Sequence, residues 1–162
     1  MSIEAVRKYF SALGIENRIL EFPVSSATVE LAAAALDTAP ERIAKTLSFK
    51  KDEGCILVVA AGDARIDNRK FRETFGMKAK MLPHDEVCAL TGHAVGGVCP
   101  FAVNEGVAVY LDRSLQRFST VFPACGSSNS AIETNCEELY ELSRAEGWVD
   151  VCHLPEEKSD EI

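Results

Sequence analysis

The first segment of the chain places its apolar residues at helical spacing. Ile3, Val6, Phe10 and Leu13 recur at intervals of three or four positions and are followed by Gly14. This pattern predicts an amphipathic helix with one buried face, which the glycine ends. A second helix is predicted in VSSATVELAAAAL, where hydroxyl residues that can cap a helix precede an alanine-rich run that stops near Asp37 and Pro40.

Three later segments also have the composition or periodicity of helices. IDNRKFRETFG carries Phe71 and Phe75 on one helical face. PHDEVCALTG begins with Pro83, a residue that suits the first turn of a helix. CEELYELS is the last of the three. We therefore expect short helices distributed along the whole chain.

Strand-like runs are interspersed among these helices. AKTLSFK and CILVVAAG are separated by the charged turn KKDEG and predict a β-hairpin, and GVAVYLD predicts another strand. Shorter strands are predicted in NRILEF, KAKML, TVFPACG, SAIETN and WVDVC. Since helices and strands follow one another without a strict alternation, the predicted fold is an α/β single domain. Its sheet is mixed, curved or partly closed, and surrounded by helices.

Length and composition allow one ordinary domain. A chain of 162 residues with 47% apolar content is long enough for a single buried core. We predict one domain over residues 1–154 and an acidic, disordered tail over residues 155–162. The first residues are charged and lack the apolar run of a signal peptide, and no later run approaches the length of a membrane span. We expect a cytoplasmic protein without membrane contacts.

The formal net charge of -8 argues against a broad affinity for nucleic acids, DNA included. The exception is the segment from Gly62 to Lys80, in which six basic residues accompany three acidic ones. One interpretation is a solvated helix face. The other is a weak landing site for a phosphate backbone, carried by Arg65, Arg69 and Lys70.

Cysteine and histidine patterns give little support for metal chemistry. The six cysteines contain no CxxC pair, and the three histidines form no HxxxH or HExxH motif. We predict reduced, mostly buried thiols and no metal site. A nucleophilic pair of Cys99 with His93 as its base is an alternative, although the sequence identifies no third residue to orient the histidine.

The segment TGHAVGGVCPF is unusually rich in glycine. It matches neither a Walker A motif nor GxGxxG, so a phosphate cradle of either kind is not indicated. Gly92, Gly96 and Gly97 allow the backbone to approach a ligand, and Pro100 restricts the exit of the loop. The pattern is consistent with an ordinary connecting loop or with a pocket wall that presents backbone amides.

Lys45 is the third candidate. Strand alternation in AKTLSFK places Lys45 on the same face as Leu47 and Phe49, so that a charge shares a face with core residues. Such a lysine either extends its ammonium to solvent at the end of a sheet or places this ammonium at the mouth of a pocket. In a pocket, the ammonium is directed at a phosphate, a hydroxyl or a developing oxyanion.

Four segments together resemble a known family. IAKTLSFK, VVAAGDARIDNRKF, TGHAVGGVCPF and FPACGSSNSAIE occur in the order and spacing of the YbaK/prolyl-tRNA synthetase editing-domain family of aminoacyl-tRNA deacylases, and the resemblance covers residues 2–152. It implies a mixed α/β fold around a curved sheet. It also implies hydrolysis of the ester that joins a small mischarged amino acid to the 3′ end of tRNA, with Cys or Ala on proline tRNA as leading examples.

The resemblance also assigns roles to particular residues. Lys45 matches the lysine most associated with activity, and the loop from Gly96 to Pro100 matches a GxxxP loop that lines the aminoacyl pocket. The segment from Ala124 to Gly126 matches another pocket wall. The resulting substrate-binding set is Gly96, Gly97, Val98, Cys99, Pro100, Phe101, Ala124, Cys125 and Gly126. The implied partners are the aminoacylated end of tRNA and prolyl-tRNA synthetase, and no metal or organic cofactor is implied.

The chain departs from the family pattern at several positions. Ala102 stands where many members have glycine, and Cys99 stands where serine is common. Gly126 is followed by serines where cysteine-type deacylases carry basic residues, and no histidine lies between His93 and His153, where alanine-type members have one. The identity of the amino acid therefore stays open. A binding module without turnover and a hydrolase that uses the Cys99 thiol are the alternatives.

Overall fold

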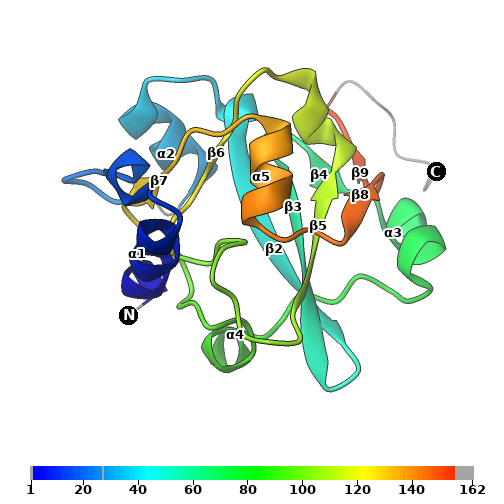
Figure 1. Cartoon of the computed structure of the whole chain (residues 1–162). Coiled ribbons are helices and arrows are strands. Elements are labelled where there is room, and N and C mark those ends of the chain that lie inside the picture. The colour runs from blue at the N-terminus through cyan, green and yellow to red at the C-terminus, as the bar shows by residue number, and fades with distance from the viewer. Residues whose placement is uncertain (1, 27, 156–162) are drawn as a thin grey trace.

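Two long antiparallel strands, β2 (Ile43–Lys51) and β3 (Gly54–Ala61), form the centre of the computed structural model (Figure 1). Every residue of β3 from Cys55 to Ala61 is buried, because both faces of this apolar strand are covered. β5 (Ala108–Asp112) pairs in parallel with β3, and β6 (Phe122–Pro123) pairs in parallel with β2. The predicted hairpin is therefore confirmed, and it is the core of the sheet.

The main sheet has five strands in the order β6-β2-β3-β5-β8, where β8 (Gly147–Val149) is parallel to β5. One antiparallel and three parallel pairings make it a mixed sheet, and it is curled into a half-barrel. The predicted α/β fold with a mixed, curved sheet and surrounding helices is confirmed. The structure describes residues 2–26 and 28–155, so all of the predicted tail except Pro155 lies outside the described residues.

The remaining elements surround or extend this sheet. Two small antiparallel pairs, β1 with β7 and β4 with β9, lie outside the main sheet. Their bounds and those of the helices are α1 (Ser2–Ala12), β1 (Leu20–Glu21), α2 (Val29–Leu36), β4 (Arg65–Ile66), α3 (Asn68–Phe75), α4 (His84–Thr91), β7 (Ser130–Ala131), α5 (Cys136–Leu142) and β9 (Cys152–His153). Within these described residues, no helix has the length and apolar character needed to cross a bilayer.

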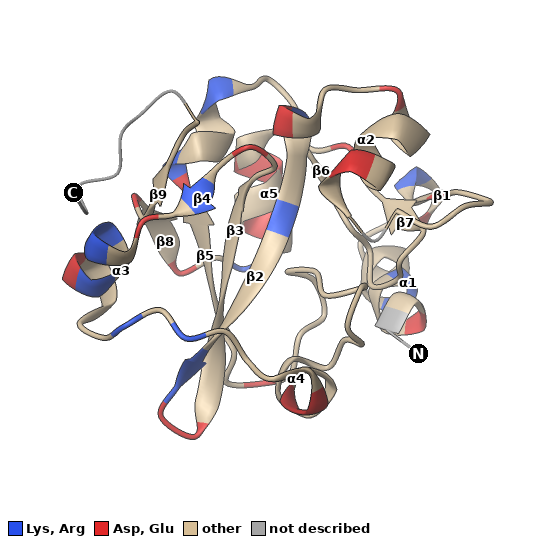
Figure 2. Ribbon diagram, turned by 180° about the vertical axis from the view of Figure 1, so that it is seen from behind, with Lys and Arg blue, Asp and Glu red and all other residues tan. Residues whose placement is uncertain are grey.

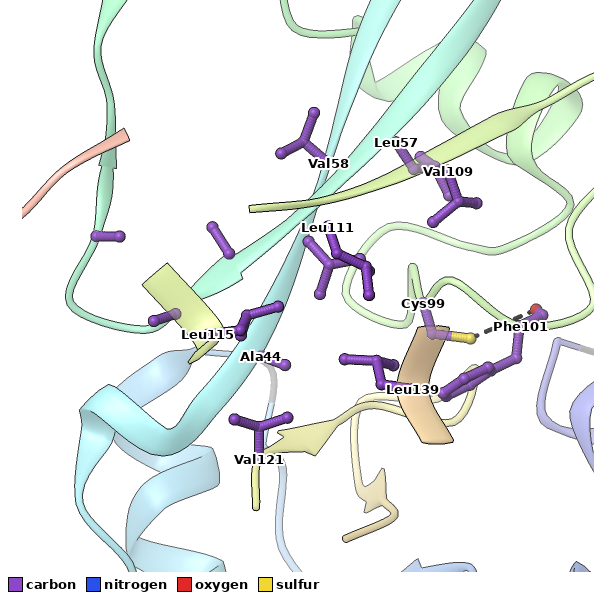
Figure 3. Close-up of a cluster of buried hydrophobic side chains, with 14 of the residues drawn as sticks. Ala44, Leu57, Val58, Cys99, Phe101, Val109, Leu111, Leu115, Val121 and Leu139 are labelled. Atoms are coloured by element: carbon purple, nitrogen blue, oxygen red, sulfur yellow. Dashed lines mark hydrogen bonds between the residues drawn. The ribbon is translucent and has the colours of Figure 1, made fainter. Parts of the chain in front are cut away.

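Buried side chains join the helices to the sheet. α5 covers one face of it, in front of the strands in Figure 1, and Leu139 of this helix is fully buried. Figure 3 shows Leu139 gathered with Leu111, Leu115 and other apolar side chains of the core. On α3, Phe71 lies with its ring centroid 4.8 Å from that of Phe49 on β2. The ring centroids of Phe71 and Phe75 are 4.7 Å apart, so the two residues share one helical face as predicted.

Asp112 fastens the C-terminal segment to the end of β5. Its carboxylate is 1% exposed and accepts hydrogen bonds from the amides of Ser114 and Val151, both at 2.9 Å. A buried carboxylate is tolerated where charge-assisted hydrogen bonds of this kind satisfy it. Asp112 therefore holds the turn after β5 and the connection between β8 and β9 in one arrangement.

Several shorter strands were predicted with the wrong extent. NRILEF forms a 3₁₀ turn over Glu16–Arg18 before the two residues of β1, and Arg18 pairs with Glu138 at 2.6 Å. KAKML is not a strand, because the chain turns into α4 after one bridge between Met81 and Phe49. WVDVC is divided between β8 and β9, because the amide of its fourth residue is hydrogen-bonded to Asp112.

TVFPACG and SAIETN contain only β6 and β7, with two residues each, and an isolated bridge between Val121 and Thr134. The prediction for Leu13 was also wrong: α1 ends at Ala12, and Leu13 is 50% exposed. In the short strand segments the chain bends after two or three residues. Their sequences therefore do not show the alternation of apolar and polar residues by which a strand is predicted.

We expect Asp112→Ala to lower the free energy of unfolding by about 2–4 kcal/mol, because two buried amides lose a charged acceptor. Urea denaturation monitored by circular dichroism measures this change. Asp150→Ala is the matched control, since the Asp150 side chain is 44% exposed and its ion pairs with Lys70 and Arg113 lie at the surface. Equal effects of the two substitutions would contradict the role given to Asp112.

Candidate functional site

A cavity of about 370 Å³ lies beside β2. It is bounded by the start of α2, the start of α4, the glycine loop, and the segments around β6 and β7. This volume lies within the range of about 300–1,000 Å³ that is usual for small-molecule sites. Apart from Gly96, the lining is apolar except for Ser26, Thr28, Lys45, Thr46, Ser48, His84 and Ser130.

Of the predicted site residues, the cavity is lined by Lys45, Gly96, Val98 and Ala124. These come from three segments that are far apart in the sequence, namely β2, the glycine loop and the chain after β6. The fold therefore brings together the lysine and the two predicted walls.

Lys45 is half-buried, and two backbone carbonyl groups hold its ammonium. Nζ donates to the carbonyl oxygen of Gly62 at 3.3 Å and to that of Ala64. Burial lowers the pKa of Lys45, and the guanidinium of Arg65 lowers it further. An ammonium positioned by neutral carbonyls keeps its positive charge available to a ligand, because no carboxylate of the described residues forms an ion pair with it.

Gly62 is required for this arrangement. A Cβ atom at this position would lie 2.0 Å from the carbonyl oxygen of Pro40. Only glycine allows the end of β3 to approach the chain before β2 so closely. The close approach places the Gly62 carbonyl where it accepts the hydrogen bond from Lys45.

The glycine loop packs its backbone directly on the second predicted wall. A Cβ atom on Gly97 would lie 2.8 Å from the carbonyl oxygen of Gly126. Gly96 and Gly126 have φ values of 89° and 94°, a region that favours glycine. The amide of Gly97 donates to the carbonyl of Ala94 at 2.9 Å, so it is already engaged. The amides of Gly96 and Val98 have no partner among the described residues.

Other members of the predicted substrate-binding set lie in the core, behind the glycine loop and the segment around Gly126. Cys99, Phe101 and Cys125 are 0% exposed, and Pro100 is buried as well. Figure 3 shows Cys99 in the apolar core with its thiol directed at the carbonyl oxygen of Phe101, 3.6 Å away. These residues support the wall from the core side. Gly97 and Gly126 form the contact between the walls.

The Cys99–His93 pair has the wrong environment for a nucleophile and its base. Burial raises the pKa of the Cys99 thiol to about 12, because an apolar surrounding disfavours the thiolate. His93 is fully buried, and burial lowers its pKa. Its Nε2 lies 2.7 Å from the carbonyl oxygen of Phe101 and 3.5 Å from the Cys99 sulfur. The pair is a structural contact inside the core.

Sequence reasoning missed the polar residues that the cavity presents. Thr46 and Ser48 alternate along β2 on the face opposite to Leu47, and both line the cavity. Their alternation within an otherwise apolar strand was the available signal. His84 was interpreted as a surface residue; it is exposed and also lines the cavity at the start of α4.

The predicted basic segment lies on β4 and α3. Figure 2 shows Lys and Arg residues on both elements, together with acidic residues on α3. Part of this charge is paired: Arg69 lies 3.2 Å from Glu73, and Lys70 lies 3.2 Å from Asp150. Arg65 is exposed and influences the Lys45 ammonium electrostatically, so this surface lies near the lysine.

The chain is similar to several known proteins. A family model described as an aminoacyl-tRNA editing domain matches residues 24–142. The uncharacterized protein YwhH of Bacillus subtilis (strain 168) is 55% identical over 153 residues, which are 94% of this chain and 98% of YwhH. Proline–tRNA ligase of Bacillus cytotoxicus is 25% identical over 120 residues, which are 72% of this chain and 21% of the ligase.

Two solved structures share the whole fold. One is a proposed trans-editing enzyme for prolyl tRNA synthetase, with a TM-score of 0.83 and 29% identity over 94% of this chain and 97% of that one. The other, the hypothetical protein APE2540, has a TM-score of 0.81 and 31% identity over 92% of this chain and 99% of that one. The half-barrel and its surrounding helices are therefore shared with these structures.

We expect iodoacetamide to modify Cys88 in the native protein at neutral pH and to leave Cys99 unmodified. Cys88 is exposed, whereas Cys99 is fully buried with a raised pKa. Peptide mass spectrometry after timed labelling measures both sites, and labelling in urea is the control that makes every thiol accessible. Rapid modification of Cys99 in the native protein would contradict its assignment to the core.

Proposed function

The chain belongs to the aminoacyl-tRNA editing domain family, and we propose that it is a trans-acting deacylase that hydrolyses the ester of a small mischarged amino acid on tRNA. The observation that supports this most directly is the cavity. It brings the Lys45 cation and the backbone of the glycine loop to one small-molecule-sized space. The proposed partners are the aminoacylated end of tRNA and prolyl-tRNA synthetase.

The proposed chemistry needs no protein nucleophile. An aminoacyl ester is already activated, so catalysis requires a positioned water or substrate hydroxyl and stabilisation of the tetrahedral oxyanion. We assign Lys45 to the terminal adenosine, through its phosphate or ribose hydroxyl, with electrostatic help to the transition state. The free amides of Gly96 and Val98 are the loop donors available for the ester carbonyl. The amide of Gly97 is not available, because Ala94 accepts its hydrogen bond.

The size of the cavity favours a small amino acid. About 370 Å³ must hold the aminoacyl group together with part of the nucleoside that carries it. Cys and Ala on proline tRNA are the leading candidates. A synthetase discriminates poorly between residues that differ by one methylene, which changes binding by about 1–3 kcal/mol, so a separate hydrolytic step is useful for such residues.

A binding module of the same fold is the second candidate. Two observations favour it: the net charge of -8, and the serines that follow Gly126 where cysteine-type deacylases carry basic residues. Such a module would recognise aminoacylated RNA ends or a related small metabolite without turnover. Hydrolysis of a charged tRNA by catalytic amounts of the protein distinguishes the two functions.

We expect the protein to hydrolyse Cys-tRNA or Ala-tRNA in a panel of Cys-, Ala-, Ser- and Pro-charged proline tRNAs. Lys45→Ala should lower kcat/KM by about 100-fold or more, because one preorganised electrostatic contact to the transition state is lost. Deacylation is followed as loss of the labelled amino acid from tRNA. If no member of the panel is hydrolysed above background, the enzyme proposal fails for these substrates.

Two controls test the assignment of Lys45. Lys51→Ala removes an exposed lysine from the other end of the same strand and should leave kcat/KM unchanged. Cys99→Ser should have only a mild effect, whereas a thiol hydrolase would lose its activity. Full activity of Lys45→Ala would show that the proposed mechanism is wrong even where the function is right.

We expect Arg69→Glu combined with Lys70→Glu to weaken tRNA binding and to reduce its dependence on salt, because fewer phosphate counterions are released. Filter binding at several salt concentrations measures both quantities. Lys8→Glu combined with Lys51→Glu is the charge-matched control: both residues are exposed, and they lie on α1 and at the end of β2, away from α3. If both double substitutions weaken tRNA binding equally, the basic segment is a solvated helix face and not a specific phosphate contact.

A further inference from the structure

The outer edge of β2 is covered at both ends and open between them. Near its start, Ile43 and Ala44 pair with β6. Farther along, the amide of Lys50 donates to the carbonyl of Lys80 at 2.8 Å, and the main-chain carbonyl of Ser48 accepts a hydrogen bond from the amide of Leu82 at 3.1 Å. Between these two covered stretches, the cavity takes the place of a neighbouring strand.

Thr46 is the residue of β2 whose main-chain amide and carbonyl face the cavity between these two covered stretches. In an antiparallel pair, alternate residues direct their N–H and C=O groups away from the partner strand. Ser48 and Lys50 are directed outward in this way, so the same alternation directs the amide and carbonyl of Thr46 outward. Neither group has a hydrogen-bond partner among the described residues.

The side chain of Thr46 is unsatisfied as well. Its Oγ1 is buried and makes no hydrogen bond to any described residue, although Thr46 lines the cavity. Buried hydroxyls and strand amides in folded proteins almost always have partners. Three unsatisfied polar groups of one residue, all beside one cavity, indicate that a ligand supplies the partners.

We propose that the aminoacyl group binds Thr46 as a single added β-strand residue. This inference rests on the proposed function and identifies where the substrate's amino acid lies within the site. In a hydrogen-bonded antiparallel pair, two residues exchange both of their N–H···O=C bonds. An aminoacyl ester carries the same two groups, an amino donor and a carbonyl acceptor on adjacent carbons. The amino group donates to the Thr46 carbonyl, and the Thr46 amide donates to the ester carbonyl.

The neutral polar groups around the cavity agree with this orientation. An α-ammonium group needs acceptors, and the described residues that line the cavity include no Asp or Glu. The carbonyl and the hydroxyl of Thr46 are neutral acceptors directed at one space. Directly paired residues place their side chains on the same face of a sheet, so the substrate side chain lies with that of Thr46 in the cavity.

Hydrolysis then uses the same hydrogen bonds. The ester carbonyl oxygen that accepts from the Thr46 amide becomes the oxyanion of the tetrahedral intermediate when water adds to the carbonyl carbon. The ester C–O bond breaks next, the tRNA hydroxyl leaves with a proton, and the free amino acid remains. The Thr46 amide is therefore one donor of the oxyanion hole, and the glycine loop supplies donors from across the cavity.

The kinetic test compares two acyl groups on the same tRNA. Thr46→Val removes the hydroxyl and keeps the shape and the backbone. We expect it to lower kcat/KM about tenfold for alanyl-tRNA, because an acceptor for the ammonium is lost. For propionyl-tRNA, which lacks the amino group, the change should stay within about twofold. Thr46→Ser keeps the hydroxyl and should restore the preference for the alanyl group. An equal loss for both acyl groups would overturn the inference.

Thermal unfolding gives an independent readout. A hydroxyl that is unsatisfied in the free protein destabilises it, so Thr46→Val should melt at the same temperature as the wild type or higher. A hydroxyl with a structural role would give the opposite result. A decrease of several degrees in Tm for Thr46→Val would therefore contradict the assignment of Thr46 to the ligand.

Hydrogen exchange of the Thr46 backbone amide tests this inference independently of the proposed function. We expect the Thr46 amide to exchange rapidly in the free protein and slowly with millimolar 3′-alanylamino-3′-deoxyadenosine, a stable amide analogue of the ester. The buried amide of Val58 in β3 is the reference. Protection without hydrolysis of alanyl-tRNA would support the site and refute the enzyme. Hydrolysis with an unprotected Thr46 amide, or no effect of the analogue, would overturn the inference.

Discussion

The main-chain pairing of β2 with β3 is the interaction on which the site depends. It runs without interruption from Ala44 opposite Ala61 to Lys51 opposite Gly54. Because β3 is buried along its length and also pairs with β5, it holds β2 in a fixed position. β2 can therefore leave part of its other edge uncovered without losing its strand geometry. The cavity occupies this uncovered part, with the Lys45 cation at its margin.

Burial separates the reactive side chains from the cavity. Cys99, Cys125 and His93 are all fully buried, and their charged forms are disfavoured by the apolar core. The polar groups that line the cavity are backbone amides, hydroxyls, the His84 imidazole and the Lys45 ammonium. Such a set of groups stabilises developing charge and positions a substrate. It is suited to the hydrolysis of an ester that is already activated, where a protein nucleophile adds little.

The sequence allowed the long elements and the general location of the site to be predicted. The hairpin and α3 carry strong patterns, because long buried strands and a pair of aromatic residues on one helical face depend on local spacing. The gap at Thr46 could not be predicted, because it depends on where β6 and the chain around Met81 stop pairing with β2. The inward direction of Cys99 was equally hidden, since the loop before Phe101 has no period that assigns faces.

Opposite charges on different surfaces of the protein are consistent with the proposed substrate. A net charge of -8 repels the phosphate backbone over most of the surface, so only a limited contact with tRNA is favourable. Basic residues lie on β4 and α3 (Figure 2), and Arg65 of β4 is close enough to Lys45 to lower its pKa. In the proposed complex, an RNA that approaches this surface brings its end toward the cavity. The few phosphates engaged there give weak binding, so specificity must come from the short aminoacylated end that enters the cavity.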